Sequence, residues 1–263
     1  MSFNQPQTTD LKLILGSFLE VLIHEILYLR SLYPRDAFGT TRHNGISCHA
    51  CRHPKVVEYI YNVLKVAVPS LISGAADEVA LIFYEDTGDG CGGEVVLERY
   101  SIFCAVQLQE FISPTSIDND SIRGKIPKLE QSLRNVLLKF LSLDGTNLGR
   151  KRGHKTFSGN TTFKLCLHTA SDKIQVEEDG MNRSTTDMES GTSCPELSAA
   201  LEEGKWFISE PDFCQIKSKE QASNPESSRS QNSMTRPLKS VHIPGFEMQI
   251  LMEFLGDGQQ ETS

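Results

Sequence analysis

Cysteine and histidine side chains gather in one short stretch of the chain, HNGISCHACRHP at 43–54. Cys48 and Cys51 form a C-x-x-C pair there, and three histidines lie within the same stretch. Thiolates and imidazoles are ligands that Zn²⁺ prefers, and such a pair can also act as a reactive dithiol. A closed zinc site usually draws a second ligand pair from elsewhere, and the chain has no second pair of this kind. We therefore expect no bound metal, and a metal- or thiol-dependent protein built on Cys48 and Cys51 stays as the alternative from a different class.

Two other motifs have simpler interpretations. The string GDGCGG at 88–93 matches G-x-G-x-x-G, but dinucleotide-binding loops need a helix after them to receive the pyrophosphate, and a strand-forming run follows here. We interpret this string as a turn. We interpret the basic run GRKRGHK at 149–155 as a solvated loop rather than a phosphate site. No Ser/His/Asp group or carboxylate pair stands out, so the sequence predicts neither an active site nor a cofactor.

Charge and composition argue against several further classes of protein. The chain has 263 residues, with 26 Lys+Arg against 34 Asp+Glu and a net charge of −8. A protein this acidic is not expected to bind nucleic acid directly. The most apolar segment, 11–33, carries four charged side chains, and no signal-peptide pattern precedes it, so we expect neither a membrane span nor secretion. Seven cysteines without a repeated spacing are typical of reduced thiols in an intracellular protein.

Three segments have the apolar spacing of helices. In 11–33 polar side chains follow a single line spaced by four, which predicts a helix buried on most sides, with Asp10 as its cap and Pro34 as its end. The second begins at Pro54, where the missing N–H costs nothing. The third covers 126–140.

Strand-forming composition marks the remaining apolar runs. The runs at 79–84 and 94–106 flank the glycine-rich turn and predict a hairpin, and alternation predicts further strands at 163–167 and 246–254. The fold class is therefore α+β, with a mainly antiparallel sheet packed against three helices.

Two polar stretches interrupt this pattern. No aromatic residue occurs between Phe163 and Trp206 or between Phe213 and Phe246. We predict disordered insertions at 172–204 and 214–235, because little in them can offset the entropy cost of ordering. The apolar islands after them are too small for a second core, so we predict one domain, 10–256, with its core at 10–170.

The order of these segments resembles the HORMA domain. The resemblance is carried by FLEVLIHEILYLRSLYP at 18–34, HPKVVEYI at 53–60 and VLERYSI at 96–102. KWFISE, RPLK at 236–239 and EMQILMEF at 247–254 are similar to the branch of the family that supplies the accessory subunit of translesion DNA polymerase zeta, the mitotic-arrest-deficient-like B form. The resemblance covers roughly 10–170 and 205–254.

This resemblance implies a nuclear, non-catalytic adaptor, with the cytoplasm as a second location. A C-terminal seatbelt, 205–256, would clamp a peptide of the polymerase zeta catalytic subunit, and a second surface would bind a Y-family scaffold polymerase. A dimer of two HORMA domains and an AAA+ remodeller are further implied partners. A spindle-checkpoint type of HORMA protein is the alternative within the family.

The resemblance also assigns residues. Tyr59 and Trp206 would flank the peptide, Leu238, Gln249 and Leu251 would form the second-partner surface, and Arg134 would lie on the dimer face. Leu251 stands where the family commonly has an aromatic residue.

Overall fold

The strands of the main sheet come from two distant parts of the chain. The computed structural model describes residues 5–86, 94–112, 120–142, 157, 159–169, 199–200 and 233–255. The elements are α1 (Gln5–Leu29), the 3-10 turn η1 (Arg35–Ala37), β1 (Phe38–His43), β2 (Ile46–Cys51), α2 (Pro54–Ser73), β3 (Glu78–Asp86), β4 (Glu94–Val106), α3 (Leu108–Ile112), α4 (Asp120–Ser142), β5 (Thr161–His168), β6 (Ser233–Ile243) and β7 (Phe246–Leu255).

The main sheet has the strand order β5-β3-β4-β7-β6, and each neighbouring pair is antiparallel. The predicted hairpin is confirmed, because β3 pairs with β4 along its whole length. The predicted strands at 163–167 and 246–254 are β5 and β7. The turn predicted at 88–93 lies outside the described residues. The sheet therefore places β5 at one end of the strand order and β6 at the other.

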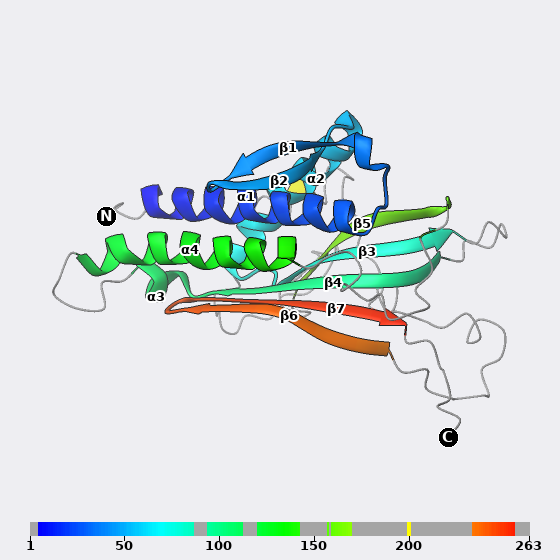
Figure 1. Cartoon of the computed structure of the whole chain (residues 1–263). Coiled ribbons are helices and arrows are strands. Elements are labelled where there is room, and N and C mark those ends of the chain that lie inside the picture. The colour runs from blue at the N-terminus through cyan, green and yellow to red at the C-terminus, as the bar shows by residue number, and fades with distance from the viewer. Residues whose placement is uncertain are drawn as a thin grey trace, which may run out of the picture.

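Helix α1 lies between the β1–β2 hairpin and α4 (Figure 1), and it also packs against α2. This position explains why its sequence is apolar on most sides. Eight of its apolar side chains are completely buried: Leu11, Leu15, Phe18, Leu19, Leu22, Ile23, Ile26 and Leu27. Burying one such side chain stabilises a fold by about 1.5–3 kcal/mol, so α1 contributes strongly to the stability of the fold.

Both ends of α1 differ from the prediction. The helix begins before Asp10, so this side chain lies inside the helix and does not cap it. It ends before Pro34, because Ser31 adopts the left-handed conformation with φ of 52°. The N–H of Leu32 then donates to the carbonyl oxygen of Leu27 at 3.3 Å, as in a Schellman cap. Glycine usually occupies such a position. Because a serine stands here, the sequence did not predict this helix end.

The β1–β2 hairpin was not predicted, although its turn has a recognisable signal. Asn44 and Gly45 have φ of 47° and 76°, the conformation of the tight turns that Asn-Gly favours. The hairpin packs against α1. Helix α2 begins at Pro54 as predicted and ends at Ser73, where Gly74 follows as the cap with a φ of 72°.

Helices α2 and α4 connect this assembly to the sheet. Helix α2 contacts β4 and β5, and α4, which covers the predicted third helix, contacts β6. The helices lie on one side of the sheet (Figure 1), which we call its inner face; the opposite side is the outer face. Among the described helices, α2 has the length and composition of a membrane span, but 56% of the apolar window is buried inside the protein, as is usual for a core helix.

The edges of both predicted insertions contain ordered structure. Strand β6 begins at Ser233, so the predicted boundary at 235 falls inside a strand. Ala200 is helical and 6% exposed, within the insertion predicted at 172–204. The remaining residues of both stretches lie outside the described residues.

Candidate functional site

Tyr59 lies on α2 beside the outer strand β5. Its hydroxyl accepts a hydrogen bond from the backbone N–H of Leu165 at 2.9 Å. Its ring packs edge-on against Phe163, with 5.7 Å between the ring centroids. The residue is nevertheless 38% exposed. Tyr59 therefore combines a fixed hydroxyl with an accessible aromatic surface.

The Leu165 hydrogen bond also shows how β5 is oriented. An N–H that donates to a side chain of α2 cannot donate to β3 in the same sheet, so this group points to the outer edge of β5. Burial raises the pKa of the Tyr59 hydroxyl, although the Leu165 N–H opposes this shift. The hydroxyl is therefore neutral at physiological pH and can donate a hydrogen bond as well as accept one.

The predicted second-partner residues do not share one surface. Gln249 is exposed and Leu251 is half-buried, both on the outer face of β7. Leu238 is 6% exposed and packs in the main core on the inner face. The pairing of β6 with β7 shifts between Pro237 and Lys239, and this irregularity turns Leu238 inward. Leu238 can therefore support this region but cannot contact a partner on the outer face.

The other predicted site residues are only partly described. Trp206 lies outside the described residues. Arg134 is half-buried on α4, and its buried Nε has no hydrogen-bond partner among the described residues.

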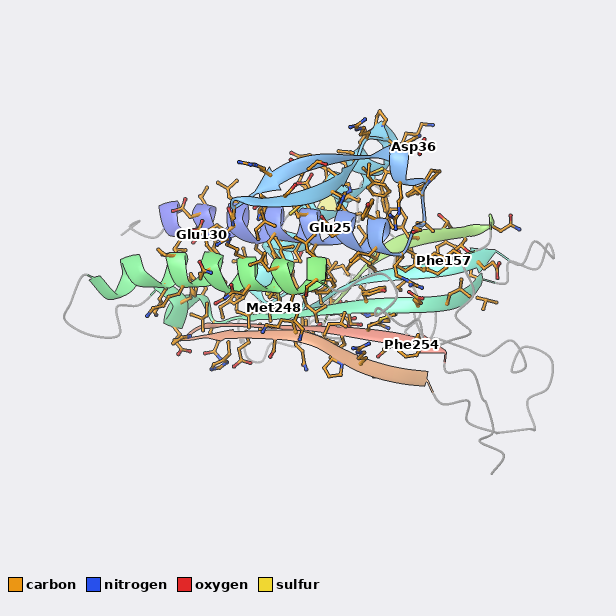
Figure 2. All side chains as sticks on the ribbon, in the orientation of Figure 1. Glu25, Asp36, Glu130, Phe157, Met248 and Phe254 are labelled. Atoms are coloured by element: carbon orange, nitrogen blue, oxygen red, sulfur yellow. The ribbon has the colours of Figure 1, made fainter. Side chains whose placement is uncertain are left out.

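The Cys/His stretch serves to join the β1–β2 hairpin to α1. The backbone N–H of His49 donates to the completely buried carboxylate of Glu25, and the His49 Nδ1 lies 3.2 Å from its second oxygen. Figure 2 shows Glu25 on α1, below the β1–β2 hairpin. The ring of His49 stacks on Tyr28 with 3.6 Å between centroids. Cys48 and Cys51 are buried in the core. Burial, together with the charge of Glu25, raises the pKa of Cys48, which disfavours a reactive thiolate.

Metal binding would need several of these side chains to converge. Among the residues that the structure describes, no group of three or more His, Cys, Asp or Glu side chains is placed to hold a metal ion. His24 instead accepts a hydrogen bond at 3.4 Å from the backbone N–H of Cys51. The imidazoles of His24 and His49 are thus engaged in packing and hydrogen bonds between α1 and β2.

Comparison with known proteins places this arrangement in a family. No protein-family profile matches the chain. MAD2B of Danio rerio, named a mitotic spindle assembly checkpoint protein, is 33% identical over 174 residues, which are 63% of this chain and 72% of that relative. The chain belongs to the MAD2B family of HORMA proteins. Within the MAD2B family, the human protein is 26% identical over the same length of 174 residues.

Two shorter matches carry a second name. The DNA polymerase zeta processivity subunit of Schizosaccharomyces pombe is 43% identical over 68 residues, and that of Arabidopsis thaliana is 30% identical over 80 residues. These matches span only about a third of each relative, 32% and 37% respectively.

Solved structures confirm the HORMA fold that the sequence predicts for this MAD2B-family chain. A chain of the mitotic checkpoint complex aligns with a TM-score of 0.56 at 12% identity and covers 92% of this chain and 97% of that one. Caenorhabditis elegans HTP-2 bound to a HIM-3 closure motif aligns with a TM-score of 0.52 at 13% identity and covers 91% of this chain and 87% of that one. At these identities the likeness concerns the fold.

Proposed function

We propose that this protein is a non-catalytic HORMA adaptor of the translesion DNA polymerase zeta complex, acting in the nucleus in DNA damage tolerance. In this role it clamps a short peptide of the polymerase catalytic subunit with a seatbelt that includes Trp206. It bridges this subunit to a Y-family scaffold polymerase through the outer face around Gln249 and Leu251. Arg134 on α4 serves a contact between HORMA domains, and an AAA+ remodeller releases the clamp.

The observation that carries the proposal is the position of Tyr59 against β5. An extended peptide gains affinity by adding its backbone to an outer strand, and neighbouring pockets select its side chains. β5 is an outer strand whose Leu165 N–H is already bound by the Tyr59 hydroxyl, so the peptide would lie along β5 against the exposed part of Tyr59. HTP-2, of the same fold, is bound to closure motifs, and two relatives are named polymerase zeta subunits; both support this role.

Peptide binding can be tested with one pair of variants on α2. The probe is a fluorescent peptide from the polymerase zeta catalytic subunit of the same organism, titrated against the full chain. Tyr59→Ala should weaken binding at least about tenfold, because it removes an aromatic anchor. Tyr61→Ala is the matched control, since Tyr61 is 58% exposed on the same helix. Equal affinities of both variants and the unchanged protein would exclude a role for Tyr59 in the clamp.

A checkpoint role is the second candidate, favoured by the name of the MAD2B relatives. It uses the same clamp but a different peptide. Affinity purification from cells before and after DNA damage separates the two roles. Recovery of polymerase zeta supports the first role, and recovery of spindle-checkpoint proteins alone supports the second.

A further inference from the structure

The outer face of the sheet carries one partly exposed aromatic side chain near the predicted second-partner residues. Phe103 on β4 is 36% exposed. It lies directly opposite Gln249 on β7. Leu251 of β7 lies opposite Ser101, which is two residues before Phe103 on β4. Directly opposite residues of an antiparallel pair present their side chains on the same face, close to each other. Phe103, Gln249 and Leu251 therefore form one patch.

Small or polar neighbours keep this patch accessible. Ala105 follows Phe103 on the same face of β4 and is exposed, and Ser240 of β6 lies opposite Gln249 and is also exposed. Neither side chain is long enough to cover the aromatic ring. A molecule approaching the outer face at β4 and β7 thus meets an aromatic surface beside an amide.

Carboxylates lie at both ends of the patch. Glu247 and Glu253 are on β7 at the spacing that places them on the same face as Gln249 and Leu251. Glu247 is exposed and lies 2.8 Å from His242, an ion pair that is open to solvent and therefore weak. Arg99, opposite Glu253, already binds Glu78 at 2.6 Å. The patch is therefore apolar at Phe103 and Leu251 and is bordered by carboxylates: Glu78, opposite Phe103 on β3, is the partner of Arg99, and Glu247 is the exposed one.

We propose that Phe103 is the aromatic anchor of the second-partner surface, and that the partner is a protein segment presenting an apolar side chain flanked by lysine or arginine. This inference rests on the proposed function for the identity of the partner, the scaffold polymerase. Aromatic residues dominate the affinity of protein interfaces, and opposite charges at the rim steer association.

The test uses the full chain and the purified Y-family scaffold polymerase of the same organism. Phe103→Ala should weaken binding at least about tenfold, and Phe103→Tyr should retain it. Leu138→Ala is the matched control, because Leu138 is 44% exposed on α4, away from the outer face. Glu247→Lys should weaken binding at low salt and lose this effect at high salt. Thermal melting of each variant establishes that it is folded.

Three results would separate the inference from the proposed function. If the scaffold polymerase binds and Phe103→Ala matches Leu138→Ala, the inference is wrong and the bridging role stands. If Leu251→Ala weakens binding while Phe103→Ala does not, the anchor is Leu251 alone. If the unchanged protein binds the catalytic-subunit peptide but not the scaffold polymerase, both the bridging role and the inference are wrong, and the clamp remains.

Discussion

The guanidinium of Arg30 and the carboxylate of Glu98 form a buried ion pair between the end of α1 and β4. The Arg30 Nε donates to a Glu98 oxygen at 2.8 Å, and the two side chains are only 6% and 3% exposed. The Tyr100 hydroxyl donates to the same carboxylate at 3.3 Å. The ring of Phe157 lies 5.0 Å from the Arg30 guanidinium carbon. This pair fixes the central helix relative to the sheet.

Removing one partner of this pair should destabilise the fold strongly. Arg30→Met leaves the Glu98 carboxylate buried without its cation, and we expect a loss of about 3–5 kcal/mol in the free energy of unfolding. Urea denaturation measures it. The double variant Arg30→Met, Glu98→Gln should recover part of the loss. A single variant within about 1 kcal/mol of the unchanged protein would mean that the pair is not needed.

Stability should fall in mild acid because of His24. Burial lowers the pKa of His24 from 6.5 to about 4. Between pH 6.5 and about pH 4, the unfolded chain therefore binds a proton at His24 that the folded protein does not bind. The contribution of His24 to the free energy of unfolding is fully present above pH 6.5 and is lost as the pH falls to about 4. The contribution is of the order of 3 kcal/mol.

His24→Gln isolates this contribution, because glutamine keeps an acceptor for the Cys51 N–H and does not titrate. Denaturation curves of both proteins between pH 7 and pH 4 give the comparison. We expect a shallower decrease for the variant, and parallel curves would show that His24 is not the titrating group.

The hydroxyl of Tyr59 should protect the amide of Leu165. Tyr59→Phe removes the acceptor and keeps the ring, so hydrogen exchange at Leu165 should become faster and the fold should lose about 1 kcal/mol. Exchange followed by mass spectrometry over residues 161–168 measures it. Tyr61→Phe should leave this segment unaltered. Unchanged protection in Tyr59→Phe would place the Leu165 amide in another hydrogen bond.

Buried thiols should resist labelling in the folded protein. Burial raises the pKa of Cys104 to about 12 and also raises that of Cys48. Thiol reagents should therefore label both only in denaturant, as peptide mapping by mass spectrometry would show. Rapid labelling of Cys48 in the native protein, or about one zinc per chain lost in a Cys48→Ser, Cys51→Ser variant, would favour the metal or thiol alternative.

The sequence predicted those helices and strands that are specified by residues within the element itself. Pro54 set the start of α2, and alternation located β7, because both depend on backbone geometry alone. The end of α1 at Ser31 was missed because a residue other than glycine takes the left-handed conformation. The hairpin turn at Asn44-Gly45 was also missed, although Asn-Gly is typical of such turns.

Site residues depend on which face each side chain occupies, and that requires the register. Leu238 faces inward only because β6 shifts its pairing with β7 at Pro237, which no periodicity in the segment reveals. Phe103 lies beside Gln249 only because β4 pairs with β7, and these two strands are far apart in the sequence. The position of Tyr59 on the second helix was predictable, whereas its bond to Leu165 was not.

The pairing of β4 with β7 has a kinetic consequence. About 140 residues separate the end of β4 from the start of β7, so closing this ladder requires a long loop. Folding rates fall as such distant contacts increase, because the loop entropy is lost before the contacts form. While the chain is being synthesised, β4 leaves the ribosome well before its neighbour exists. During that interval one edge of β4 presents unpaired backbone groups, the feature that promotes aggregation of nascent chains.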